Sequence, residues 1–195
     1  WTRAELAAGA RVFAEQGYLV LPGFCAPAFC DALAAEVRCA LDPVLGPAEY
    51  EADVGYPGAP RDRAAPGGDT PRRLLHAYSR FAALRTFATG PDLGAWLAAV
   101  MDTGDVRLSQ CHHNCVMTKA PGFSSVTLWH QDVRYWSFAR PELVSVWLAL
   151  GPETAENGAL AVIPGTHRMA LAPERLDETK FLRADLEENQ HLIAT

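Results

Sequence analysis

The chain has 195 residues, of which 49% are hydrophobic and 21% charged, and its formal net charge is −6. This is the composition of an ordinary globular protein with enough residues for one core. An acidic chain without a long basic run is unsuited to phosphate neutralisation, so we expect no nucleic-acid partner. No apolar stretch reaches the roughly 18 residues that cross a bilayer, so we expect no membrane partner. The five cysteines are odd in number and scattered, which predicts free thiols and a cytoplasmic location.

The N-terminal part of the chain is predicted to be mostly helical. Thr2 and Glu5 are spaced as a capping box, which predicts a helix to about Gln16. A short strand is expected over 18–21, before Pro-Gly, and further helices over 26–41 and 93–101. Residues 52–73 carry four prolines and four glycines, which predicts a long loop: a surface excursion, or a lid beside a site.

From residue 106 onwards the pattern changes to strands. The expected strands cover 106–118, 125–133, 143–150 and 159–163, with Asn157-Gly158 as a turn. Helices followed by consecutive strands predict a mainly β fold with flanking α-helices, either an antiparallel sandwich or a jelly roll. We interpret residues 1–195 as a single domain.

The most specific short motif is Trp129-His130-Gln131-Asp132. Side chains two apart on a strand emerge on one face, so His130 and Asp132 are expected side by side. An imidazole and a carboxylate are two members of the 2-His-1-carboxylate triad that binds Fe(II). Arg134 would share their face if the strand continued. It could bind an acidic substrate, or be an ordinary solvated arginine.

The predicted strand 143–150 has two different faces. From Val144 to Leu150 the even positions are aliphatic, and the odd positions are Ser145, Trp147 and Ala149. Small residues around an aromatic side chain are suited to line a ligand cavity. The alternative is a Trp147 packed under a helix.

Several blocks together resemble the phytanoyl-CoA dioxygenase family of iron(II)/2-oxoglutarate oxygenases. They occur in the family's order and spacing, and a Gly-Tyr-Leu-Val-Leu-Pro-Gly stretch at 17–23 is similar to its N-terminus. The blocks are Leu128-Trp129-His130-Gln131-Asp132, Tyr135-Trp136, Val146-Trp147-Leu148, Glu156-Asn157-Gly158-Ala159-Leu160 and Ile163-Pro164-Gly165-Thr166-His167-Arg168. The resemblance implies a double-stranded β-helix, a cupin-like jelly roll.

The resemblance also implies roles for particular residues. His130 and Asp132 match two iron ligands, and Trp147 matches an aromatic that contacts 2-oxoglutarate. Cys115 and Lys119 match positions that line and close the co-substrate pocket. His76 falls near a further polar contact.

The family also has a second, distal histidine ligand and an arginine for 2-oxoglutarate. After Asp132 the chain has only His167 and His191. His167 belongs to the Pro-Gly-Thr-His turn, and His191 to an expected strand at 190–193. We therefore expect the third ligand to be missing and the fold to lack its C-terminal strands, with His191 as the fallback ligand.

The implied reaction is hydroxylation of an aliphatic C–H of a small-molecule substrate, with 2-oxoglutarate and O₂ converted to succinate and CO₂. Asp132 argues against a halogenase, in which a small residue replaces the carboxylate. The alternatives are a non-catalytic metal-binding jelly roll, or a cupin-type isomerase or hydrolase. A zinc site at Cys111, His113 and Cys115 is disfavoured because these residues crowd one short segment.

Overall fold

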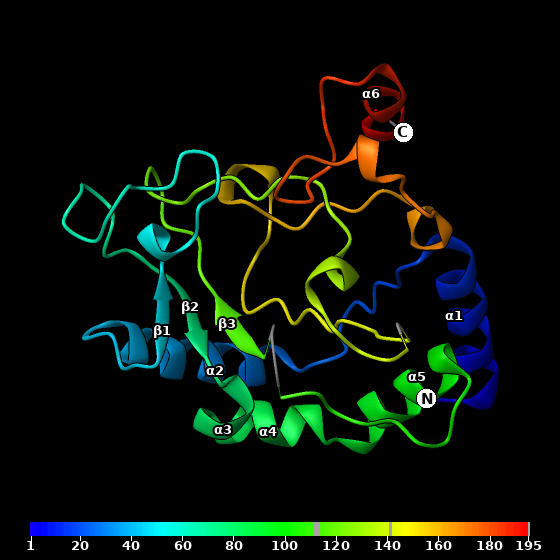
Figure 1. Cartoon of the computed structure of the whole chain (residues 1–195). Coiled ribbons are helices and arrows are strands. Elements are labelled where there is room, and N and C mark those ends of the chain that lie inside the picture. The colour runs from blue at the N-terminus through cyan, green and yellow to red at the C-terminus, as the bar shows by residue number, and fades with distance from the viewer. Residues whose placement is uncertain (111–113, 141, 195) are drawn as a thin grey trace.

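The computed structural model describes residues 1–110, 114–140 and 142–194, apart from the side chains of residues 134 and 135. The helices before residue 102 lie along the bottom and right-hand side of Figure 1, the C-terminal helix lies at the top, and long extended segments run between them. The described α-helices are α1 (Arg3–Gln16), α2 (Pro27–Leu41), α3 (Ala77–Arg80), α4 (Ala82–Ala88), α5 (Pro91–Met101) and α6 (Glu187–Ile193). Within this described part, no helix is both long and apolar enough to cross a bilayer.

Helix α1 has the capping box that its sequence predicts. The Glu5 backbone N–H donates to Thr2 Oγ1 at 3.2 Å, and the Thr2 N–H donates to the Glu5 carboxylate at 2.7 Å. Gly17 ends the helix in the left-handed region at φ 83°, which glycine adopts without strain. The helices predicted over 26–41 and 93–101 are likewise confirmed as α2 and α5.

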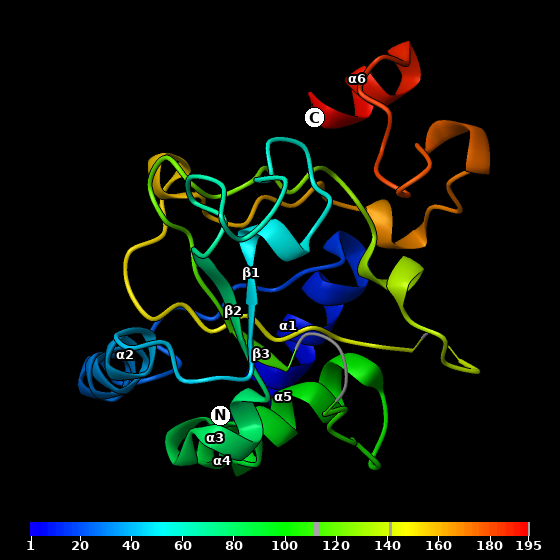
Figure 2. The same ribbon diagram turned by 60° about the vertical axis from the view of Figure 1, so that its left-hand side comes forward.

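The three described strands form one antiparallel sheet in the order β1-β2-β3. They are β1 (Ala48–Tyr50), β2 (Pro71–Leu75) and β3 (Cys115–Met117), and they lie together in both views (Figure 2). Leu74 is opposite Val116, and Leu75 is opposite Cys115. The predicted loop 52–73 is confirmed over most of its length, because it connects a 3₁₀ turn, Glu51–Asp53, to β2.

The main core lies between α2 and this sheet. Leu33 and Leu74 are fully buried and belong to one apolar cluster. The other buried members of the cluster are Val37, Ala40, Ala77, Phe81 and Val116. Leu148 and Leu150 pack against it from the distant 143–150 segment, so the predicted aliphatic face contacts the core at these two positions.

The predicted mainly β fold is not what the structure shows for the described residues. Of the four predicted strands, only the part at Cys115–Met117 forms a ladder, and the segments 125–131, 143–150 and 159–163 run extended or irregular. A strand is defined by a partner in register, and alternation in the sequence does not supply one. The remaining 3₁₀ turns are Asp132–Tyr135, Ala155–Asn157, Thr166–Arg168 and Pro173–Arg175.

Two smaller strand predictions are also wrong. Residues 18–21 form no ladder, and Val20 is 69% exposed. Residues 190–193 belong to helix α6, whose first turn carries Glu187 and Glu188. Acidic side chains stabilise a helix N-terminus, and this local preference outweighs the short apolar pattern on which the strand was based.

Candidate functional site

His130 and Asp132 lie side by side, although they do not share a strand. The chain enters a 3₁₀ turn at Asp132, and this bend brings His130 Nε2 to 3.2 Å from Asp132 Oδ1. The two side chains are 20% and 38% exposed, so solutes can reach both. The pairing that the motif predicts is therefore present, with a turn in place of the expected strand.

The other ring nitrogen of His130 is fixed by the backbone. His130 Nδ1 is 2.7 Å from the Leu128 carbonyl oxygen, which can only accept, so Nδ1 carries the proton and donates. Nε2 is then unprotonated, and its lone pair faces the Asp132 carboxylate, which also can only accept. Two acceptors face each other stably only with a proton or a cation between them. This arrangement fits a shared metal ion.

The residues between and beside this pair are also held. The Gln131 side-chain amide donates to the carbonyl oxygens of Thr166 and Met169, at 3.0 and 3.2 Å. Ser145 Oγ lies 3.3 Å from Asp132 Oδ2 and donates to it. These contacts fix the turn from two sides, one of them the Pro-Gly-Thr-His turn at 164–167.

A buried ion pair lies just ahead of the motif. Glu51 and Arg72 are 0% and 1% exposed, and Arg72 Nη1 is 3.1 Å from Glu51 Oε2. Ser125 joins them, because its hydroxyl accepts from Arg72 at 2.8 Å and donates to Glu51 at 2.7 Å. Burial tends to raise the pKa of Glu51, but the Ser125 hydrogen bonds and the Arg72 charge outweigh it and lower that pKa.

This ion pair was not predicted from the sequence. Glu51 directly precedes the 52–73 loop and Arg72 lies at its C-terminal end, in β2, so their pairing depends on the β1–β2 register. Within Pro71–Leu75, Arg72 and Leu74 share the buried face. An arginine on a buried face is uncommon unless it is paired, so a charge at that position was the only available signal.

The structure describes all three predicted co-substrate residues, Cys115, Lys119 and Trp147. Cys115 is on β3 opposite Leu75, and burial raises the pKa of its thiol. Lys119 follows β3 and donates to the Ser125 carbonyl at 3.1 Å; its partial burial and the Arg72 charge lower its pKa. Trp147 is 47% exposed, and its indole N–H donates to Glu153 at 2.7 Å.

His167 and His191 are the two histidines that follow Asp132 in the chain. No group of three His, Cys, Asp or Glu side chains suited to a metal occurs among the described residues. His167 instead donates from Nε2 to the Ala14 carbonyl at 3.2 Å, at the end of α1. His191 lies in the last turn of α6. The Arg134 side chain, Cys111 and His113 lie outside the described residues.

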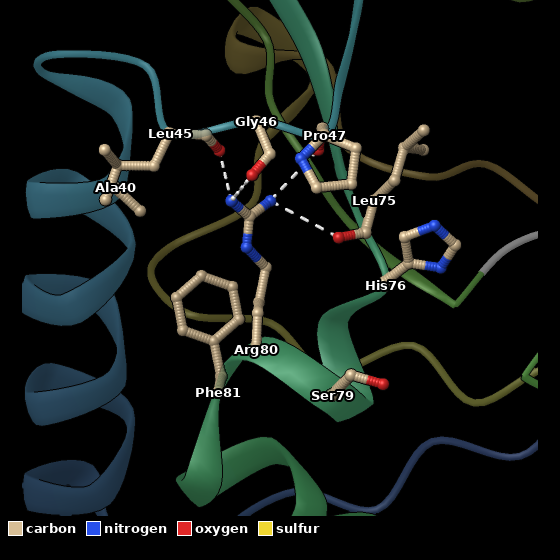
Figure 3. A pocket seen from close by; sticks show the side chains of 9 residues that line it. All are labelled: Ala40, Leu45, Gly46, Pro47, Leu75, His76, Ser79, Arg80 and Phe81. Atoms are coloured by element: carbon tan, nitrogen blue, oxygen red, sulfur yellow. Dashed lines mark hydrogen bonds between the residues drawn. The ribbon is translucent and has the colours of Figure 1, made fainter.

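His76 lines a different hollow, a surface pocket of about 610 Å³ (Figure 3). Arg80 occupies its centre and donates to four carbonyl oxygens, those of Leu45, Gly46, Pro47 and Leu75. The guanidinium therefore fastens the loop after α2 to the end of β2. His76 itself has φ 58°, where the chain turns from β2 into α3.

Comparison with known proteins places the chain in a family. The family model described as phytanoyl-CoA dioxygenase matches residues 13–193. This match covers nearly the whole chain, so the chain belongs to the phytanoyl-CoA dioxygenase family, whose general fold is a cupin-like jelly roll.

Two curated relatives carry dioxygenase names. "Dioxygenase FrzG" from Cladobotryum sp is 26% identical over 196 residues, covering 89% of this chain and 58% of its own length. A "Probable phytanoyl-CoA dioxygenase" from Caenorhabditis elegans is 34% identical over 65 residues, covering 31% of this chain and 21% of its own length. The chain thus spans just over half of the first relative and about a fifth of the second. No solved structure matches it.

Proposed function

We propose that this chain carries the iron site of a non-haem Fe(II)/2-oxoglutarate-dependent dioxygenase. The observation that supports it most is the geometry of His130, with Nδ1 committed to the Leu128 carbonyl and Nε2 facing Asp132 at 3.2 Å. An imidazole nitrogen and a carboxylate oxygen suit a divalent iron, and hydrogen bonds to the other atoms of these side chains hold them in position. Family membership supports the oxygenase class.

When bound, Fe(II) with 2-oxoglutarate would activate O₂ for hydroxylation of an aliphatic C–H of a small molecule, releasing succinate and CO₂. Within the chain, His130 and Asp132 would hold the metal, and the Leu128 carbonyl and the Ser145 hydroxyl would orient them. Their orientation before binding reduces the cost of assembling the site.

We assign the co-substrate contacts to Trp147, Cys115 and Lys119, and a substrate contact to Arg134. Lys119 supports this most directly, because a cation that is partly buried suits a carboxylate ligand. We further infer that residues 1–195 act as one oxygenase domain. Its segments 143–150 and 159–163 would then correspond to strands of the family's double-stranded β-helix.

The decisive assay is succinate formation that depends on 2-oxoglutarate and Fe(II). His130→Ala and Asp132→Ala should abolish it, because each removes one of the two proposed ligands. His167→Ala is the matched control, since His167 contacts the end of α1. The assay is run on this chain and on a version with any native residues that the gene encodes after Thr195. If turnover survives in both ligand variants, the assignment is wrong.

A non-catalytic metal-binding protein is the second candidate. It is supported by the absence of a third His, Cys, Asp or Glu beside His130 and Asp132 in the described part of the chain. It predicts binding of Co(II), as a probe for Fe(II), that requires both residues without any succinate formation. A cupin-type isomerase or hydrolase would likewise make no succinate, but would convert its substrate without 2-oxoglutarate.

A further inference from the structure

We propose that Arg72 is a positioning residue for His130, acting through two separate routes. This inference rests on the proposed metal site, because it concerns the ring that would bind the metal. Arg72 is far from the motif in sequence, and its side chain is 1% exposed. Its terminal nitrogens Nη1 and Nη2 donate hydrogen bonds to different residues, and the face of its guanidinium lies over an aromatic ring.

The first route runs along the backbone. Arg72 Nη2 donates to Thr127 Oγ1 at 2.8 Å, while Nη1 donates to Ser125 Oγ at 2.8 Å. The Ser125 N–H also donates to Glu51 at 3.0 Å. The buried ion pair thus holds the segment that leads into Leu128, whose carbonyl accepts from His130 Nδ1.

The second route runs through aromatic rings. The Arg72 guanidinium lies over the Tyr56 ring, 4.8 Å from its centroid. Tyr56 meets Phe181 edge to face at 5.2 Å, and Phe181 meets the His130 ring edge to face at 5.7 Å. Phe181 is 1% exposed, so this stack has little freedom to move. Edge-to-face pairs favour a definite ring angle, and the stack therefore orients the imidazole plane.

The two routes constrain different features of one ring. The backbone route fixes the position of the Leu128 carbonyl that accepts from Nδ1. The aromatic route fixes the tilt of the imidazole ring. Together they determine where Nε2 points. Tyr56 belongs to the 52–73 loop, so this loop acts on the His130 ring through Phe181.

Replacing Arg72 itself would leave Glu51 buried without its partner, so the test uses milder changes. Thr127→Val removes the acceptor of the first route, and Thr127 is itself exposed. Tyr56→Leu removes the ring of the second route. The matched controls are Thr118→Val, which loses a hydroxyl bonded to the Pro71 carbonyl, and Tyr56→Phe, which keeps the ring.

The first readout needs no metal. In the chain labelled with ¹⁵N-histidine, the His130 Nδ1–H, assigned by its loss in His130→Ala, should exchange slowly with solvent. Thr127→Val and Tyr56→Leu should each speed this exchange several-fold. The double variant should speed it most, and Thr127→Ser should restore it. Both controls should leave it unchanged.

The second readout is the apparent dissociation constant for Co(II). Each route variant should weaken binding about tenfold, the lower end of the loss seen when a residue that orients a ligand is removed. If the wild-type chain binds no Co(II) through His130 and Asp132, the proposed metal site fails, and the proton exchange still decides the positioning role. If exchange at His130 Nδ1–H is unchanged in the double variant, the role of Arg72 is overturned.

Discussion

At the scale of single residues, the candidate site is defined by acceptors that face a histidine from both sides. The Leu128 carbonyl accepts from His130 Nδ1 at 2.7 Å, and Asp132 Oδ1 lies 3.2 Å from His130 Nε2. The other carboxylate oxygen of Asp132, Oδ2, accepts a hydrogen bond from the Ser145 hydroxyl. Short local contacts therefore set the pair's geometry, and the bend at residue 132 gives it a compact form that the predicted strand would lack.

The role of Trp147 can be tested by a conservative change. The indole is 47% exposed and bonded to Glu153, so Trp147→Phe should cost less than about 1 kcal/mol of unfolding free energy. If Trp147 contacts 2-oxoglutarate, the same change should raise the concentration of 2-oxoglutarate needed for half-maximal turnover. A large fall in melting temperature with an unchanged co-substrate response would instead place Trp147 in the core.

At the scale of elements, two glycines on facing helices provide a matched comparison. Gly9 of α1 faces Trp96 of α5, and a Cβ there would overlap the indole ring. Gly94 of α5 has open space around its Cβ position. Gly9→Ala should therefore destabilise the protein by about 1–3 kcal/mol through overpacking. Gly94→Ala should stabilise it by about 0.5–1 kcal/mol, because alanine favours a helix interior. Urea unfolding of both variants measures the difference, and equal effects would contradict the α1–α5 packing.

The Glu51–Arg72 pair predicts how stability responds to acid. The folded state lowers the pKa of Glu51 below its unfolded value of roughly 4.3. Below that pH the unfolded chain takes up the proton first, so the stabilisation is present above about pH 4.3 and is lost as pH falls through the folded pKa. Glu51→Gln should flatten this acid limb of a stability–pH curve.

Glu49→Gln is the control for that experiment, because Glu49 is 25% exposed and pairs with Arg73 at 2.7 Å, while its distance to Arg72 Nε is 3.9 Å. It should change the acid limb much less. An acid limb that is the same in Glu51→Gln as in the wild type would show that the buried pair does not contribute in this way.

The helical elements could be predicted because their signals are local. Thr2, Glu5 and Gly17 mark the two ends of α1 within the sequence itself, and the structure places all three as predicted. The pairing of His130 with Asp132 was predictable because the two residues are only two positions apart in the sequence. The ion pair was not, since Glu51 meets Arg72 only after the sheet has set its register.

At the scale of the whole molecule, the β region was the least predictable. Alternation correctly placed Leu148 and Leu150 toward the core, but Val146 on the same predicted face is 46% exposed. A ladder needs a second segment that arrives in register from far away, and alternation in one segment carries no information about its partner. The motifs could therefore indicate the family's fold class, although most of the expected strands form no ladder among the described residues.

The sheet and the extended segments should therefore differ in their protection against amide hydrogen exchange. Amides in the β2–β3 ladder, such as those of Leu74 and Val116, lie in the main core and should exchange slowly. Amides of 143–150 and 159–163 belong to no ladder in the described structure, and their apolar side chains Val146, Leu160 and Val162 are about half exposed. They should exchange faster by orders of magnitude, as measured by mass spectrometry of peptides from the labelled chain. Equal protection in both regions would mean that these segments pair as strands in solution, which would contradict the present arrangement and favour the β-helix.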